Sequence, residues 1–166
     1  MKIHSSASSH DEAVVRFARL TERYGQHPIE AADCIVALGG DGHMLHVLHE
    51  TLEHDLPVFG MNCGRLGFLM NHFASDELTD RIKSAETAPI HPLRMTTTCA
   101  DGSTRTALAI NEVSLIRQTH NAAHIRVEVD GKHQVEELVC DGILLAPPVG
   151  SAAYTRSAHG PVVRLG

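Results

Sequence analysis

The most constraining stretch of this sequence spans residues 34–45, where an apolar segment stops abruptly at a cluster of glycines. Ile35–Leu38 has strand character, Gly-Gly-Asp-Gly occupies positions 39–42, and an apolar pattern of helical spacing begins at Met44. A buried strand that leads through a glycine turn into a helix N-terminus brings backbone N–H groups close to phosphate. Asp41, the acid of this turn, could act on a hydroxyl or a metal. We therefore expect the chain to position a nucleotide against Asp41.

Strand and helix patterns alternate around this turn, up to about residue 88. The amphipathic pattern between Asp11 and Tyr24 predicts a helix, with Ser9 or Asp11 as its cap and Gly25 as its stop. Alternating strands and helices are typical of a parallel α/β layer, in which ligands bind beyond the carboxyl ends of the strands. The predicted strands are 2–7, 32–38 and 57–61, and the predicted helices are 11–24, 43–54 and 76–87.

Beyond residue 88 the apolar period changes to two, which predicts antiparallel strands. Asp101-Gly102 and Asp130-Gly131 are strong hairpin signals between them. A further strand is expected over 136–145, followed by a helical stretch of small residues and a strand-like Val162-Val163. The fold class is thus an α/β domain over residues 1–88 and an incomplete antiparallel β-rich domain over 89–166. The other expected strands are 93–98, 104–112, 113–117 and 125–129.

Composition excludes several classes of function. The net charge of −6 and an aromatic content of 4% argue against a nucleic-acid binder, and the chain has no apolar run long enough to cross a membrane. The four cysteines are widely spaced, which favours reduced thiols in a cytoplasmic protein over disulfides or a zinc site. His43, His46, His49 and Glu50 lie close together, and we interpret them as a polar helix face rather than metal ligands.

Several motifs, in this order, resemble those of the NAD kinase family. They are Gly-Gly-Asp-Gly at 39–42, Gly-Arg-Leu-Gly-Phe-Leu at 64–69, Asn111-Glu112, Asp141-Gly142, Gly-Ser-Ala-Ala-Tyr at 150–154 and Ser-Ala-His-Gly-Pro at 157–161. A Gly-Gly-Asp-Gly turn alone is weak evidence, because lipid kinases and phosphofructokinases carry similar loops. The ordered set is specific, extends over essentially the whole chain and most resembles the short bacterial members.

The resemblance implies transfer of the γ-phosphoryl group of ATP, with a divalent metal such as Mg²⁺, to the 2′-hydroxyl of the adenosine ribose of NAD. Asp41 matches the acid that activates this hydroxyl, and phosphoryl transfer otherwise needs mainly positioning and charge neutralisation. The residues that match cofactor-binding positions are Gly39, Gly40, Gly42, Asn111, Glu112, Asp141, Ala152, Ala153, Tyr154 and Ser157.

The chain also departs from the family pattern. Pro147 and Ala152 stand where the family has threonines, and without a hydroxyl at position 152 to bind the cofactor, binding would weaken by about 0.5–1.5 kcal/mol. Family members continue beyond the length of this chain, so we expect a C-terminally truncated member that associates into homo-oligomers. The alternatives are a non-catalytic NAD-binding fragment and a related kinase of lipid or sugar hydroxyls. Taken alone, Asn111-Glu112, Tyr154 and Ser157 could be ordinary strand-edge, packing and capping residues, and Asp141 could be only a turn residue.

Overall fold

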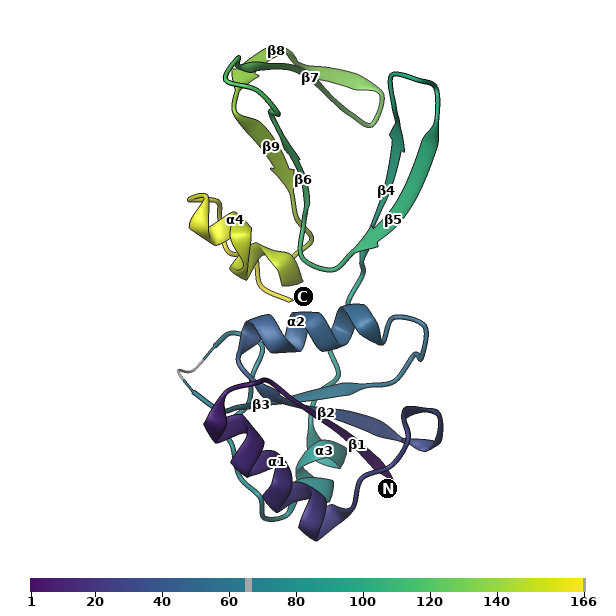
Figure 1. The fold of residues 1–166 in the computed structure, drawn as a ribbon, viewed down its shortest axis with the longest axis vertical. Coiled ribbons are helices and arrows are strands. Elements are labelled where there is room, and N and C mark those ends of the chain that lie inside the picture. The colour runs from purple at the N-terminus through teal and green to yellow at the C-terminus, as the bar shows by residue number, and fades with distance from the viewer. Residues whose placement is uncertain (65–66, 166) are drawn as a thin grey trace. The chain divides into compact units, whose positions relative to one another are not determined.

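The chain forms two compact units, Met1–Ile90 and His91–Arg164, in a computed structural model that describes residues 1–64 and 67–165. The first unit contains β1 (Ile3–Ala7), α1 (Asp11–Tyr24), β2 (Cys34–Gly39), α2 (Asp41–Glu50), β3 (Val58–Asn62) and α3 (Leu78–Ser84), with a short 3₁₀ turn at Ile29–Ala31 (Figure 1). Its strands form a parallel sheet in the order β1-β2-β3. The predicted parallel α/β layer is therefore confirmed.

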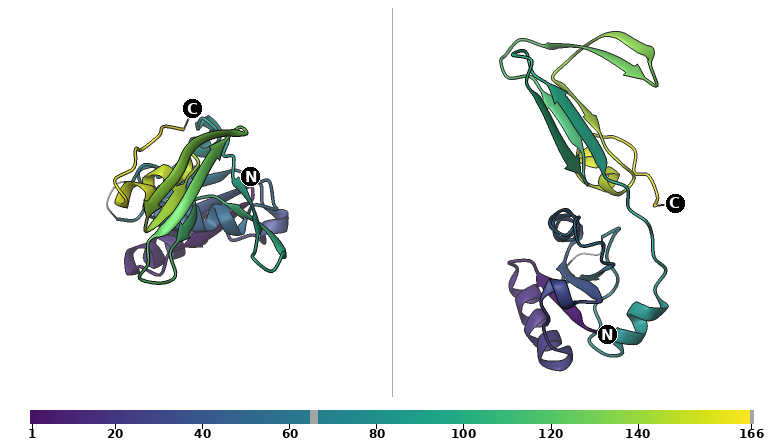
Figure 2. Two further views of the ribbon diagram at one scale, coloured as in Figure 1. Left: turned by 90° about the horizontal axis from the view of Figure 1, so that it is seen from above. Right: turned by 90° about the vertical axis from the view of Figure 1, so that its right-hand side faces the viewer.

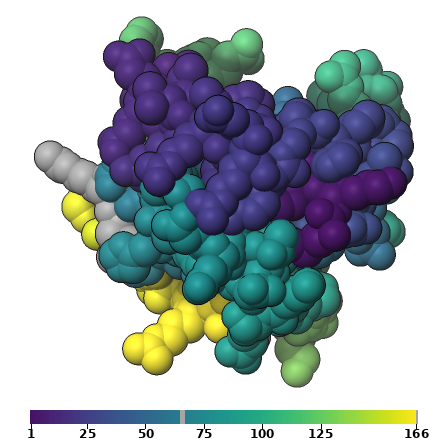
Figure 3. Space-filling model, turned by 90° about the horizontal axis from the view of Figure 1, so that it is seen from below, coloured from purple at the N-terminus to yellow at the C-terminus, as the bar shows by residue number. Residues whose placement is uncertain are grey.

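The central strand β2 is buried on both faces of this sheet. Cys34, Val36 and Leu38 pack with residues of α1 and α3, whereas Ile35 and Ala37 pack with Met44 and Val47 of α2. The right-hand view of Figure 2 accordingly shows α2 on one side of the sheet and α1 and α3 on the other. In Figure 3 the face opposite α2 is formed by the purple N-terminal segment and the teal segment that carries α3. A strand covered twice needs apolar residues at every position, which explains the unbroken run.

The second unit consists of antiparallel strand pairs. These are β4 (Leu93–Thr98) with β5 (Thr104–Ala109), β6 (Val113–Ile116) with β9 (Gly142–Leu145), and β7 (Ala123–Val129) with β8 (Lys132–Cys140). A 3₁₀ turn, η2 (Val149–Ala152), and the short helix α4 (Tyr154–Ser157) follow. Asp130 and Gly131 both have positive φ angles, 52° and 72°, as a two-residue hairpin loop requires. Both predicted hairpins are present.

Local geometry corrects several predicted boundaries. His10, rather than Ser9 or Asp11, occupies the cap position of α1, while Gly25 ends the helix as expected. Glu77 is left-handed, so α3 begins at Leu78 instead of residue 76 and ends at Ser84 instead of residue 87. Helix α2 begins at Asp41 and ends at Glu50, so the helix expected over 43–54 was placed too late in the chain.

Two expected strands differ in extent from the structure, and a third segment expected to be strand-like is not in a strand. The strand expected over 104–112 ends at Ala109, and the one expected over 136–145 is two strands, β8 and β9, separated at Asp141. Val162-Val163 lies outside any strand, because the Val163 N–H donates to the Ser151 hydroxyl at 2.8 Å instead of to a neighbouring strand. Among the described residues, no helix combines the length and the apolar character needed to cross a membrane.

The double burial of β2 predicts a large cost for truncating its side chains. Replacing the fully buried Leu38 with alanine should lower the free energy of unfolding by about 2–5 kcal/mol. Val15→Ala, on the exposed face of α1, is the matched control and should change it by less than about 0.5 kcal/mol. Urea unfolding followed by circular dichroism measures both changes. Equal costs for the two variants would contradict the burial of β2.

Candidate functional site

The candidate site begins where β2 and β3 end at the same edge of the parallel sheet. Gly39 pairs in register with Asn62, and the Cys63 N–H donates to the Gly39 carbonyl at 2.8 Å. The loops that follow the two strands therefore leave the sheet side by side. Open α/β sheets bind ligands at this carboxyl edge. Both glycine loops lie there, as the sequence predicted.

Asp41 is the first residue of α2, and two backbone amides hold its carboxylate. Its Oδ2 accepts a hydrogen bond from the Phe68 N–H at 2.8 Å, and its Oδ1 accepts one from the Leu69 N–H at 3.0 Å. Both donors belong to the second glycine loop, the one that follows β3. The acid thus has a defined orientation at the start of a helix, where the helix dipole also favours negative charge. Of the expected motif at 64–69, Arg65 and Leu66 lie outside the described residues.

The glycines of the first loop differ in what surrounds them. A Cβ at Gly39 would lie 2.7 Å from the Cβ of His43, so packing requires a glycine there. At Gly40 and Gly42 a Cβ would meet no described heavy atom within 4 Å. The absence of side chains at these two positions leaves free space at the first turn of α2, whose N–H groups lack intrahelical partners. A phosphate could use that space.

Two serines near the loop were not singled out by the sequence analysis. His43 Nε2 lies 3.3 Å from the Ser6 hydroxyl of β1, and burial lowers the pKa of His43 below its ordinary value, although the contact with Ser6 acts in the opposite direction. The Ser8 hydroxyl, just beyond β1, is buried without a hydrogen-bond partner among the described residues. In the sequence, the only indication that these two serines lie near the loop was their position at the end of the first strand.

The remaining histidines of α2, His46 and His49, are exposed. His46 Nε2 lies 3.3 Å from the carboxylate of Glu50 one helical turn later, and both side chains are largely exposed. In the part of the chain that the structure describes, no group of three His, Cys, Asp or Glu side chains could hold a metal ion. His46 and Glu50 therefore form part of an exposed polar face of α2.

In the second unit, Asn111 and Gly150 come into close contact although they are far apart in sequence. Strand β9 pairs with β6 in a register that places Leu145 opposite Val113, so the chain after β9 returns to Asn111. A Cβ at Gly150 would lie 2.7 Å from the Asn111 Cα and would overlap the Asn111 carbonyl. The structure therefore brings together two of the motifs that the sequence analysis assigned to one site.

The other predicted site residues near this contact are Glu112, which follows Asn111, and residues that follow Gly150 in the chain. One carboxylate oxygen of Glu112, Oε2, is buried without a hydrogen-bond partner among the described residues, which is costly for a charged group. Ala152 ends η2, Ala153 follows it, and Tyr154 and Ser157 are the first and last residues of α4. The Tyr154 side chain is about half exposed, so its ring remains accessible.

Asp141, which was also expected to line the ligand site, has a structural partner. Its Oδ1 lies 2.5 Å from Arg117 Nε, and the Arg117 N–H donates to the Asp141 carbonyl at 2.9 Å. These bonds join the ends of β6 and β9. The carboxylate is nevertheless largely exposed, so pairing with Arg117 leaves room for a further contact.

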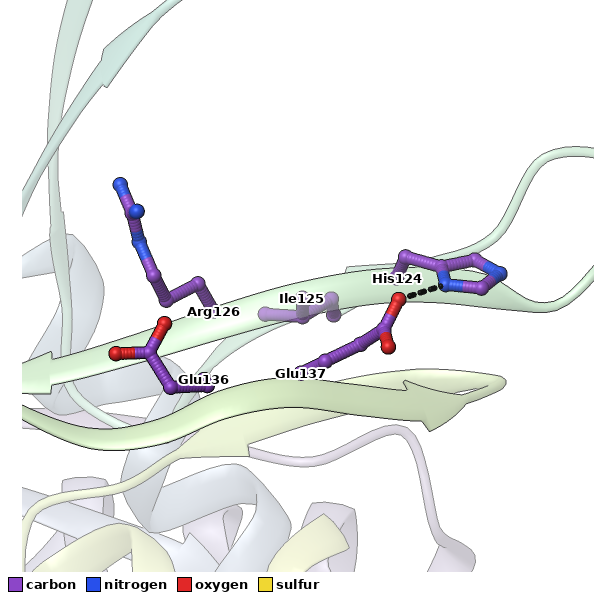
Figure 4. Close-up of a pocket in the computed structure, with 5 residues that line it drawn as sticks. All are labelled: His124, Ile125, Arg126, Glu136 and Glu137. Carbon is purple, nitrogen blue, oxygen red and sulfur yellow. Dashed lines mark hydrogen bonds and ion pairs between the residues drawn. The ribbon is translucent and has the colours of Figure 1, made fainter.

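A shallow hollow on the β7–β8 hairpin lies outside both clusters. It is lined by His124, Ile125, Arg126, Glu136 and Glu137, and His124 is 2.7 Å from Glu137 (Figure 4). The lining side chains stand on an exposed two-stranded ribbon, so the contact between His124 and Glu137 contributes little to stability. We assign no ligand to this hollow.

Comparison with known proteins gives two family matches that together cover most of the chain. The ATP-NAD kinase N-terminal domain matches residues 1–87, and the ATP-NAD kinase C-terminal domain matches residues 110–164. The two matches fall on the two structural units.

Individual relatives agree with this result. The chain is 48% identical over 166 residues to an NAD kinase of Hyphomonas neptunium and covers 65% of it, and it is 52% identical over 159 residues to one of Rhizobium meliloti and covers 62% of it. These alignments span 100% and 96% of the present chain. The chain thus spans a little under two thirds of the length of these curated relatives.

A solved structure is also similar. The crystal structure of yeast NADH kinase complexed with NADH matches 84% of this chain and 44% of its own, with a TM-score of 0.61 and 27% identity.

The buried environment of His43 predicts a pH dependence of stability. Because its pKa is lowered in the folded chain, the unfolded chain binds more protons as the pH falls through about 6.5, and the free energy of unfolding should decrease there. His43→Gln should make this decrease shallower. His54→Gln, at an exposed position just beyond the same helix, is the control and should change the slope less than His43→Gln does. Urea unfolding at a series of pH values measures the slopes, and equal slopes for wild type and His43→Gln would contradict the assignment.

Proposed function

Because the chain belongs to the ATP-NAD kinase family, we propose that it transfers the γ-phosphoryl group of ATP to the 2′-hydroxyl of the adenosine ribose of NAD, forming NADP and ADP. The observation that carries the proposal is the fixed carboxylate of Asp41 at the start of α2, beside glycines that leave open space. The alternative of a kinase for lipid or sugar hydroxyls is not favoured, because the curated relatives are NAD kinases.

Asp41 acts in this proposal as the acceptor of the hydroxyl proton. Each of its carboxylate oxygens accepts one backbone N–H, so each keeps a lone pair for a further donor. A ribose hydroxyl within about 2.6–3.2 Å of either oxygen could transfer its proton as the hydroxyl oxygen attacks the γ-phosphorus. The bond from the γ-phosphorus to the bridging oxygen breaks, and ADP leaves.

The first loop provides the surroundings for the phosphates. The space at Gly40 and Gly42 would let phosphate oxygens approach the N–H groups at the start of α2. Gly39 has a different role, because the lack of a side chain at this position makes room for His43. Charge neutralisation by loop amides is one of the main requirements of phosphoryl transfer.

The second unit contributes the contacts to the dinucleotide. Asn111 and Glu112 are proposed to hydrogen-bond NAD, and the unpartnered Glu112 oxygen supports this, since a ligand hydroxyl would satisfy it. Ala152, Ala153, Tyr154 and Ser157 are proposed to line the same site, with Asp141 at its margin. The small side chains at 152 and 153 would allow close approach of the ligand.

The described residues are compatible with a magnesium ion that is bound mainly by the phosphates of ATP. Magnesium usually keeps several waters and binds through one or two carboxylates together with substrate phosphates. Asp41 is the carboxylate of the Gly39–Gly42 loop and could offer it an oxygen, and the described residues contain no all-protein cage that would compete. When bound, the ion neutralises charge on the transferred phosphoryl group.

We also propose a cytoplasmic location. Cys34, Cys63, Cys99 and Cys140 are all free thiols, and Cys34 is buried enough to raise its pKa to about 11. Unpaired thiols in this number suit a reducing compartment.

A second candidate is a non-catalytic NAD-binding fragment. The observation that favours it is that the chain spans only 65% and 62% of two of its relatives. NADP production by the 166-residue chain, supplied with NAD, ATP and Mg²⁺, distinguishes the candidates. Bound NAD without any NADP product would favour the fragment.

Substitution of Asp41 tests the chemical role directly. Asp41→Asn should lower kcat for NADP formation by about 10²–10⁴-fold, because a neutral amide cannot accept the hydroxyl proton. Asp55→Asn makes the same chemical change at an exposed turn residue with a positive φ that asparagine tolerates, and it should retain full activity.

The fold of both variants is checked by circular dichroism, and the rate is followed by a coupled assay specific for NADP. Residual activity of Asp41→Asn within a few-fold of wild type would remove Asp41 from this role.

Association into homo-oligomers is a further part of the proposal. Leu115 of β6 and Leu145 of β9 are each more than half exposed. They lie on the same face of this strand pair, because Leu145 is opposite Val113, two residues before Leu115. A second copy of the chain could cover them. Leu115→Lys should then lower the molar mass measured by light scattering, whereas Val15→Lys on α1 should not. An unchanged mass for Leu115→Lys would contradict this interface.

A further inference from the structure

We propose that Gly67 is a positioning residue for Asp41, because only a residue without a side chain lets the Phe68 and Leu69 amides hold the carboxylate that accepts the substrate proton. This inference rests on the proposed function. We call the arrangement of Asp41, Gly67 and these two amides the carboxylate clamp.

The clamp joins two loops that are distant in sequence. Its hydrogen bonds, of 2.8 and 3.0 Å, connect residues 27 and 28 positions apart. One amide binds each carboxylate oxygen, so the plane of the carboxylate is fixed rather than only its position. Hydrogen bonds to an ionised acceptor are stronger than neutral ones, so the clamp favours one orientation of Asp41.

Gly67 makes this approach possible for a steric reason. A Cβ at position 67 would lie 2.6 Å from Oδ2 of Asp41 and closer still to Oδ1, so any other residue would collide with the carboxylate. The φ of Gly67 lies outside the left-handed range, and the glycine is therefore required for space and not for backbone freedom. Gly64, in the same loop, is the opposite case, since a Cβ there would meet no described heavy atom within 4 Å.

Displacing the carboxylate should affect the reaction more than the binding of substrates. A proton acceptor works only when its lone pair is aligned with the hydroxyl, and a shift of about 1 Å can cost about 100-fold in rate. The side chain of Asp41 has two rotatable bonds, so without the clamp it would sample several orientations. The nucleotide contacts proposed for Asn111 and Glu112 do not depend on Gly67.

Amide hydrogen exchange tests the clamp without any substrate. In the ligand-free chain, Gly67→Ala and Asp41→Ala should both increase the exchange rates of the Phe68 and Leu69 amides by at least about tenfold, because the first displaces the acceptor and the second removes it. Gly64→Ala is the matched control and should leave these rates unchanged. Exchange rates in Gly67→Ala equal to those of wild type would overturn the clamp, whether or not the chain forms NADP.

Kinetics then test the positioning role. Gly67→Ala should lower kcat for NADP formation by about 10–100-fold with KM for NAD changed less than about threefold, while Gly64→Ala keeps both constants. In an Asp41→Ala background, Gly67→Ala should cause no additional loss, because the group that it displaces is absent.

A rise in KM with unchanged kcat, or an additive loss in the double variant, would show a merely structural role and overturn the inference. If wild type forms no NADP, the proposed function fails for this chain, and the exchange rates still decide whether the clamp exists.

Discussion

The structure of the first unit depends on the burial of β2 from both faces. Every residue from Cys34 to Gly39 is buried, with α1 and α3 on one side and α2 on the other. Such a strand must end where it emerges from the two helical layers, and the chain must then turn sharply into α2. The acid at Asp41 is placed by that turn. Burial in the core thus determines where the proposed proton acceptor lies.

The sequence predicts this part of the protein well because the signals are local. An unbroken apolar run, a glycine turn and an apolar helical period predict β2, the loop and α2, and the hairpins at Asp101-Gly102 and Asp130-Gly131 follow from turn chemistry. Boundaries that depend on the backbone conformation of a single residue were missed. The left-handed Glu77, for example, carries no pattern that distinguishes it from an ordinary helical glutamate.

Contacts between distant segments explain what the sequence could not reveal about the candidate site. Nothing in the sequence near Gly67 indicates that its missing side chain accommodates a carboxylate 26 positions earlier, and the contact of Gly150 with Asn111 depends equally on strand register. The ion pair between Asp141 and Arg117 was likewise not visible in the sequence, because it depends on the pairing of β6 with β9. Family resemblance could name these positions, but only the folded chain shows which ones touch.

The small residues in the middle of the sheet have a consequence for strand alignment. A strand buried on both faces lacks the inside-outside alternation that usually prevents slippage. Ala37 lies opposite Gly60, where a Cβ would lie 2.6 Å from the sulfur of Met70, so this pair forms a notch that accepts one bulky neighbour. A slip by one residue would bring Val36 or Leu38 to the notch. The notch therefore favours the observed register of β2 and β3, in which the loops after the two strands begin at the same edge of the sheet.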